Sequence, residues 1–158
     1  MLVWNDLIKL HQLAGWRSGI YEKEHAIRTT FELSNDLNGI FYYMVYDRDF
    51  YCRVKIIEDF PDMYASDLFI LASHFNNLLV HGVVVVNVED HYVEYLLKRE
   101  WLVPLLYRSE LYEQIVRHHN TSKDIHWAFQ RLIAEDEAPA IIIADLLRRN
   151  EASDNESK

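Results

Sequence analysis

The stretch FYCRVKIIEDFPDMYASDLFILASHFNNLL, residues 50–79, decides the fold class of this chain. In its first part Cys52, Val54 and Ile56 alternate with polar or aromatic residues, and a period of two is typical of a strand with one buried face. Pro61 then suits the first turn of a helix. The apolar face of that helix is formed by Leu68, Leu71, Phe75 and Leu78. The stretch predicts a strand followed directly by a helix.

On the N-terminal side of this stretch, the sequence predicts one helix and two further strands. Apolar residues between Leu2 and Leu10 share one helical face, and Gly15 ends that helix. We interpret Arg17 to Gly19 as a linker. β-Branched and aromatic residues then predict strands over Ile27–Leu33 and Ile40–Tyr46.

On the C-terminal side, Val83–Val88 is a β-branched run that predicts a strand, and Glu89-Asp90 predicts the turn after it. In His91–Trp101, Val93, Tyr95 and Leu97 fall on one side and Glu94 and Lys98 on the other. That alternation predicts a strand with one solvated face, with a helix as the alternative. With this segment as a strand, the sheet has five strands.

The last third of the chain predicts helices. Leu111 and Ile115 mark one helix, Asn120-Thr121 is expected to interrupt it, and Thr121 with Asp124 resembles a capping box that opens a second helix. A final helix begins near Pro139. We expect a single domain over residues 1–150 and a disordered polar tail over residues 151–158.

Composition excludes several classes of function. The 158 residues are 50% hydrophobic, which suffices for one core, and the net charge of −9 repels nucleic acid and anionic membrane surfaces. Cys52 is the only cysteine, so no internal disulfide forms, and we expect a buried thiol in a reducing compartment. The N-terminus lacks a basic leader, and no apolar run approaches the roughly 20 residues of a membrane span. These features predict a soluble cytoplasmic protein.

The order of one helix, three strands, a helix, two strands and further helices resembles the YbjN family of bacterial proteins, which shares its fold with type III secretion chaperones. The resemblance covers roughly residues 4–149. It is carried by four segments: YCRVKIIEDFP, DLFILASHFNNLL, VVVVNVEDHYVEYLLKRE and the helices after WLVP.

The resemblance implies an α+β fold with one antiparallel sheet and helices on one face, of the type III secretion chaperone kind. It also implies homodimerisation and the binding of partner polypeptides. Secretion chaperones of this fold hold extended segments of their cargo, and YbjN-like proteins are linked to regulation and stress responses. Fold similarity alone transfers neither role.

The predicted hairpin of residues 40–57 is the candidate binding surface, because it is rich in tyrosine, a residue enriched at interfaces. If Arg48-Asp49 forms a two-residue loop, the tyrosines of one strand share a face with the polar residues of the next; a three-residue loop reverses that assignment. Under the first register the candidate partner-binding residues are Tyr42, Tyr46, Tyr51, Arg53 and Lys55. The leading hypothesis is therefore a non-enzymatic module that binds a partner protein through a sheet face or a strand edge.

A ligand-sensing regulatory domain is the alternative hypothesis. Its pocket would lie between the sheet and the helices, near Trp101, Tyr107 and Trp127. For a metal, His118-His119 and His126 are the candidates, but no Cys, Asp or Glu completes a ligand set at recognisable spacing. No G-x-S-x-G turn or phosphate-binding glycine loop is present. The sequence thus predicts no enzyme activity, cofactor or metal.

Overall fold

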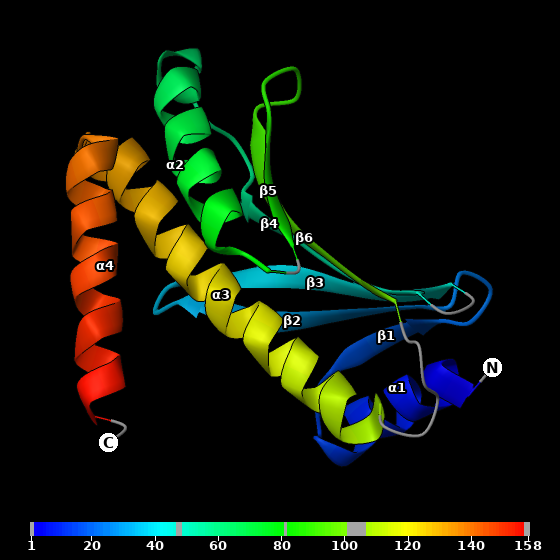
Figure 1. The fold of residues 1–158 in the computed structure, drawn as a ribbon. Helices are drawn as coiled ribbons and strands as arrows, with labels where there is room; N and C mark the ends of the chain where they lie inside the picture. The colour runs from blue at the N-terminus through cyan, green and yellow to red at the C-terminus, as the bar shows by residue number, and fades with distance from the viewer. Residues whose placement is uncertain (1, 47–48, 81, 101–106, 157–158) are drawn as a thin grey trace.

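The computed structural model describes residues 2–46, 49–80, 82–100 and 107–156. Within these ranges the fold is α+β, with a sheet covered by helices (Figure 1). The strands are β1 (Ser18–Tyr21), β2 (Ala26–Ser34), β3 (Leu37–Tyr46), β4 (Asp49–Ile57), β5 (Val83–Asn87) and β6 (Tyr92–Glu100). The helices are α1 (Leu2–Leu13), the short 3-10 turn η1 (Asp62–Tyr64), α2 (Ala65–Leu78), α3 (Tyr107–Glu135) and α4 (Pro139–Glu156).

The sheet has six strands in the order β1-β2-β3-β4-β6-β5, and every neighbouring pair is antiparallel. The prediction of five strands was wrong because β1 was interpreted as a linker. β1 has four residues and lies at the sheet edge, where Ser18 pairs with Thr29 of β2. So short a strand, with Gly19 inside it, shows little β-periodicity, and its pairing with β2 defines it. The strand prediction for residues 91–101 was confirmed over Tyr92–Glu100, and Trp101 lies outside the described residues.

One continuous helix replaces the two predicted around Asn120-Thr121. α3 runs through both residues, and Ser122 Oγ donates a hydrogen bond of 2.6 Å to the carbonyl of His118 one turn earlier. Ser122 is therefore satisfied inside the helix and does not terminate it. The predicted break was wrong because packing along α3, including buried Ile125 and Phe129, outweighs the capping signal.

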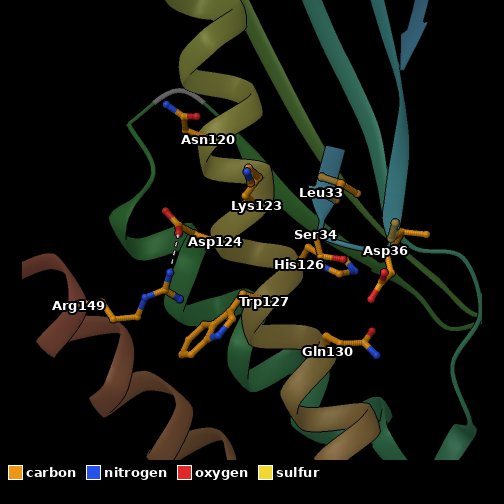
Figure 2. A pocket seen from close by; sticks show the side chains of 11 residues that line it. Leu33, Ser34, Asp36, Asn120, Lys123, Asp124, His126, Trp127, Gln130 and Arg149 are labelled. Carbon is orange, nitrogen blue, oxygen red and sulfur yellow. Dashed lines mark ion pairs between the residues drawn. The ribbon is translucent and has the colours of Figure 1, made fainter. Parts of the chain in front are cut away.

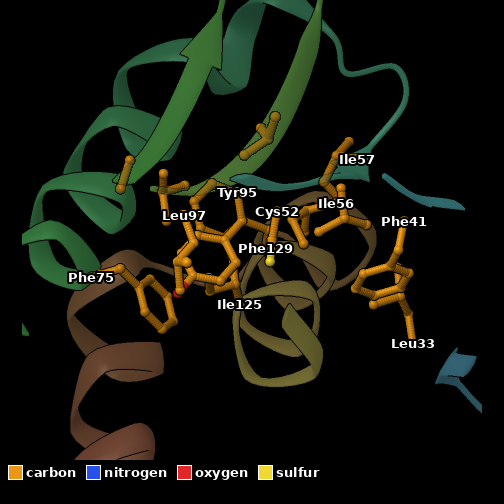
Figure 3. Packing of buried hydrophobic residues seen from close by; sticks show 14 of the residues in the cluster. Leu33, Phe41, Cys52, Ile56, Ile57, Phe75, Tyr95, Leu97, Ile125 and Phe129 are labelled. Carbon is orange, nitrogen blue, oxygen red and sulfur yellow. The ribbon is translucent and has the colours of Figure 1, made fainter. Parts of the chain in front are cut away.

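The core lies between one face of the sheet and the helices. Alternating strand residues point toward α1, α2 and α3, and Figure 3 shows Phe41, Cys52 and Tyr95 of the sheet packed in one cluster with Phe129 of α3. Cys52 is 1% exposed, which confirms the prediction of a buried thiol, and burial raises its pKa well above the usual range. A thiol in this position packs as a small hydrophobic side chain.

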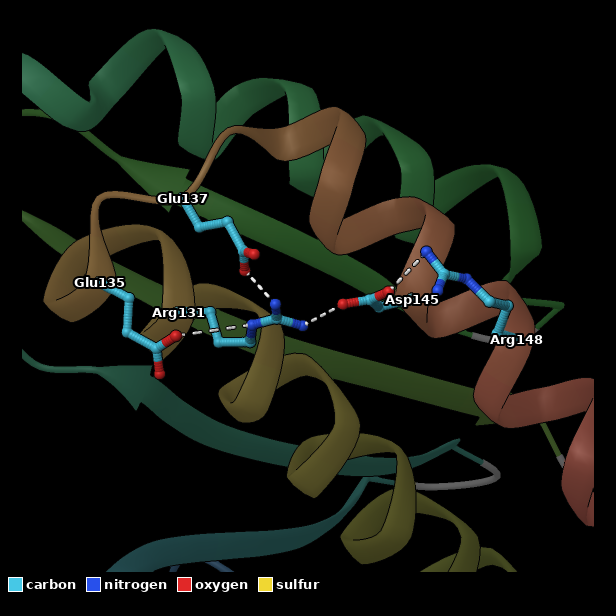
Figure 4. A network of polar contacts seen from close by, with 5 residues as sticks. All are labelled: Arg131, Glu135, Glu137, Asp145 and Arg148. Carbon is cyan, nitrogen blue, oxygen red and sulfur yellow. Dashed lines mark hydrogen bonds and ion pairs between the residues drawn. The ribbon is translucent and has the colours of Figure 1, made fainter.

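α4 packs against α2 and α3 as an outer layer, and Arg131 of α3 holds it there (Figure 4). The Arg131 guanidinium pairs with Glu137 and, at 2.8 Å, with Asp145 of α4. Arg148 pairs with Asp145 in turn, at 2.9 Å. α4 also includes most of the segment predicted to be a disordered tail; the division into one domain and a tail stays a prediction.

Candidate functional site

The face of the sheet opposite the helices is open in the part of the chain that the structure describes (Figure 1). β3 and β4 show why. Tyr43 and Val45 point into the core, so their neighbours Tyr42, Met44 and Tyr46 point outward. We call this outward side of the sheet the open face.

The hairpin register places all five predicted partner-binding residues on the open face. Tyr42 pairs with Arg53, and Met44 pairs with Tyr51. Tyr46 pairs with Asp49, so Asp49 belongs to β4 and the predicted Arg48-Asp49 loop was wrong by one residue. Both registers give the same faces, because each leaves two residues between the strands. The five residues are Tyr42, Tyr46, Tyr51, Arg53 and Lys55. Their role in binding stays a prediction.

Aromatic side chains form one end of the open face. Tyr46 is 54% exposed and Tyr42 is 38% exposed. The Tyr46 ring contacts the Tyr51 ring edge to face, with centroids 5.9 Å apart, and the Tyr51 hydroxyl donates a hydrogen bond of 3.0 Å to Asp49. These contacts fix the orientation of two large amphipathic rings, which lowers the entropy lost when a partner packs against them.

Ion pairs connect β4 to β6 across the open face. Arg53 Nε lies 2.6 Å from Glu94 Oε2, and Lys98 Nζ lies 2.8 Å from Asp49 Oδ2. The hydrogen bond from Lys98 holds the pKa of Asp49 below its usual value, and the same bond raises the pKa of Lys98. Asp49 and Lys98 therefore keep their charges at neutral pH.

A hollow of about 490 Å³ lies on the open face where β3, β4, β5 and β6 adjoin. Its lining is mainly apolar and is edged by two cationic side chains. The lining residues are Met44, Tyr51, Cys52, Arg53, Gly82, Val83, Leu96, Leu97 and Lys98. The hollow was not predicted from the sequence, although the alternation in β6 predicts that Glu94 and Lys98 lie on the solvated side. Finding it requires the pairing of β4 with β6, which is not encoded locally.

A second, larger groove of about 880 Å³ lies between α3, α4 and the β2–β3 turn (Figure 2). Trp127 lies in this groove with the Arg149 guanidinium 4.2 Å from its ring centroid and the Arg131 guanidinium 4.7 Å away. Arg149 also approaches Asp124 at 3.9 Å. Burial raises the pKa of Asp124, and Arg149 opposes that shift.

Of the three residues predicted for a ligand pocket, only Trp127 is placed in a groove. Trp101 lies outside the described residues, and Tyr107 is described only as the first residue of α3. The ligand pocket formed by these three residues stays a prediction.

The histidines considered for a metal have separate surroundings. His118 is fully buried and stacks on Tyr95 with ring centroids 4.6 Å apart, and burial lowers its pKa to about 3. His119 Nε2 lies 2.8 Å from the Glu32 carbonyl, and His126 lines the groove beside α4. Among the described residues, no group of three or more His, Cys, Asp or Glu side chains has the arrangement of a metal site.

The similarity of this chain to known proteins lies in its structure. No family model matches the chain, and no curated protein matches its sequence. The crystal structure of YbjN from E. coli superimposes with a TM-score of 0.56 over 82% of this chain and 93% of that one, at 10% sequence identity. The fold is YbjN-like. The role of YbjN as a transcription regulator is itself only proposed. A similarity at 10% sequence identity shows the fold alone.

The predicted resemblance is therefore confirmed for the fold and not for membership of the family. The described helices also include none long and apolar enough to cross a membrane.

Proposed function

We propose that this chain is a non-enzymatic interaction module that binds a partner polypeptide through the open face of its sheet. The observation that carries the proposal is the placement of Tyr42, Tyr46 and Tyr51 on the face opposite the helices. Exposed aromatic residues on a rigid sheet are a common basis of protein interfaces. The YbjN-like fold, known from a protein described as a regulator, agrees with such a role.

The charge of the chain supports a protein partner over nucleic acid. At a net charge of −9, the chain as a whole repels phosphate backbones. We expect the module to act in the cytoplasm and to form a homodimer, and light scattering at several concentrations measures the second expectation.

Affinity purification from native lysate tests the proposal. Tyr42→Ser combined with Tyr46→Ser removes two exposed rings from the open face and should abolish capture of the partner with little change in thermal stability. Phe69→Ser is the matched control, because Phe69 is 50% exposed on α2, away from the open face, and should leave capture intact. Equal capture by both variants would contradict the proposal.

A ligand-sensing role is the second candidate, and the groove beside Trp127 favours it. Its volume of about 880 Å³ falls within the range of small-molecule sites, and an aromatic ring lies beside charged groups there. A thermal-shift screen against metabolite classes tests it. A hit should be lost in Trp127→Ala, and the absence of hits removes the support for this candidate.

A further inference from the structure

The hollow on the open face has the size and lining for a large apolar side chain. Its side-chain surfaces come from Met44, Val83 and Leu96, each on a different strand. An apolar cavity of about 150 Å³ already accommodates a benzene ring. The hollow, at about 490 Å³, thus accepts an aromatic or long aliphatic side chain.

In both ion pairs beside the hollow, the cation is more exposed than the carboxylate. In the Arg53–Glu94 pair the arginine side chain is 43% exposed and the glutamate side chain 9% exposed. In the Lys98–Asp49 pair the lysine side chain is 59% exposed and the aspartate side chain 25% exposed. In both pairs the cation reaches solvent and the carboxylate lies beneath it.

A third cation extends the same pattern. Lys55 follows Arg53 by two residues in β4, so it lies on the same face. It is exposed, and its Nζ lies 4.3 Å from the centroid of the Tyr92 ring. Arg53, Lys55 and Lys98 are thus the exposed cations beside the hollow, and Glu100, opposite Asp49 at the end of β6, is an exposed carboxylate on the same face. The exposed ends of the three cations attract carboxylates of a partner and repel basic segments beside the hollow.

We propose that the hollow binds one large apolar side chain of a partner segment whose flanking residues are aspartate or glutamate. This inference rests on the proposed function and specifies the chemistry of the partner. The apolar side chain fills the hollow and supplies the buried area. The flanking carboxylates pair with the exposed ends of Arg53 and Lys98, which also have spare hydrogen-bond donors.

Fluorescence polarisation with short fluorescein-labelled peptides tests this chemistry. The probe peptide has a central Phe flanked on both sides by Glu and Asp. One matched peptide replaces the Phe with Ser, and another replaces the acidic residues with Lys. Each replacement should weaken binding at least about tenfold, which is about 1.4 kcal/mol. Added salt should weaken binding of the probe peptide further.

Variants of the protein locate the site. Val83→Trp places a large ring in the hollow and should weaken binding of the probe peptide about tenfold. Lys98→Gln should weaken it less and should reduce its salt dependence. Lys123→Gln, which removes a lysine from the groove beside α4, is the matched control and should leave binding unchanged. Melting temperatures of all three variants establish that they fold.

The outcomes separate this inference from the proposed function. Equal binding of the acidic and basic peptides, or full binding by Val83→Trp, overturns the inference. If no peptide binds while Tyr42→Ser with Tyr46→Ser still abolishes partner capture, the partner chemistry is wrong and the function stands. If the protein is a dimer that Val83→Trp dissociates, the occupant of the hollow is a second copy of the chain, and the inference is again overturned.

Discussion

Arg53 Nε lies 2.6 Å from Oε2 of Glu94, and in this pair the carboxylate is buried while the guanidinium is half exposed. The two residues lie on the neighbouring strands β4 and β6, with Lys55 directly opposite Glu94 and Leu96 opposite Arg53. The pair is thus diagonal across the ladder, and it joins the hairpin to the second half of the sheet. Removing the arginine and removing the glutamate should therefore destabilise the protein by different amounts.

Arg53→Ala should destabilise the protein by about 2 kcal/mol, because it leaves the Glu94 carboxylate buried without its partner. Glu94→Gln should cost less, because the exposed arginine regains water. Urea denaturation of both single variants and of the double variant gives the coupling energy. A larger loss of unfolding free energy for Glu94→Gln than for Arg53→Ala would contradict the claim that the buried carboxylate depends on the arginine.

Asn76 of α2 protects the free edge of β5. Its side-chain amide donates a hydrogen bond of 3.0 Å to the Val84 carbonyl, and its oxygen accepts one of 2.7 Å from the Val84 N–H. Asn76→Ala should cost about 1–2 kcal/mol and should speed hydrogen exchange at the Val84 amide. Asn77→Ala, an exposed change on the same helix, is the control. Unchanged exchange at Val84 in Asn76→Ala would show that the bonds do not persist in solution.

The buried histidines make stability depend on pH. Burial lowers the pKa of His118 to about 3 and that of His11 to about 4, against about 6.5 for an unfolded histidine. Between these values the unfolded chain binds more protons than the folded one. Stability is therefore complete above about pH 6.5 and falls as the pH decreases toward 4.

At pH 5 each of these two histidines should cost about 2 kcal/mol, which is about 1.4 kcal/mol for each of the 1.5 pH units below 6.5. Urea denaturation between pH 8 and pH 5 measures the slope. His118→Leu should reduce that slope, although it also changes the packing against Tyr95. A slope that is the same in His118→Leu and in the unmodified protein would show that His118 is already charged in the fold.

Arg131 should control how firmly α4 is attached. Its guanidinium pairs with Glu137 in the connection and with Asp145 in α4, while its own side chain is only 17% exposed. Arg131→Ala should cost about 2 kcal/mol and should raise hydrogen exchange selectively in α4. Arg148→Ala removes a mostly exposed partner of the same Asp145 and should have a much smaller effect. Equal hydrogen exchange in α4 of the two variants would show that Arg131 does not hold α4 in place.

The sequence predicted those elements whose signal is local. The alternation around Cys52 and the helical spacing after Pro61 identified β4 and α2, and the same reasoning placed Tyr42 and Arg53 on one face. β1 was missed because four residues with a glycine carry too little pattern. The break at Asn120 was wrong because side-chain capping signals compete with packing along a long helix.

The hollow and its cations depend on contacts between distant segments, which one sequence does not specify. Glu94 lies 41 residues after Arg53, and only the pairing of β4 with β6 brings them together. The same holds for the groove beside Trp127, which needs α4 to fold back toward α3. Local pattern predicted the faces of the strands, and tertiary contacts decided which residues share a site.

The most direct test of the open face as the binding surface is hydrogen exchange on the complex of this protein with the partner captured from native lysate. If the partner binds the open face, it should slow exchange in β3, β4 and β6, around residues 37–46, 49–57 and 92–100. Protection confined to α3 and α4, around the groove that contains Trp127, would contradict it.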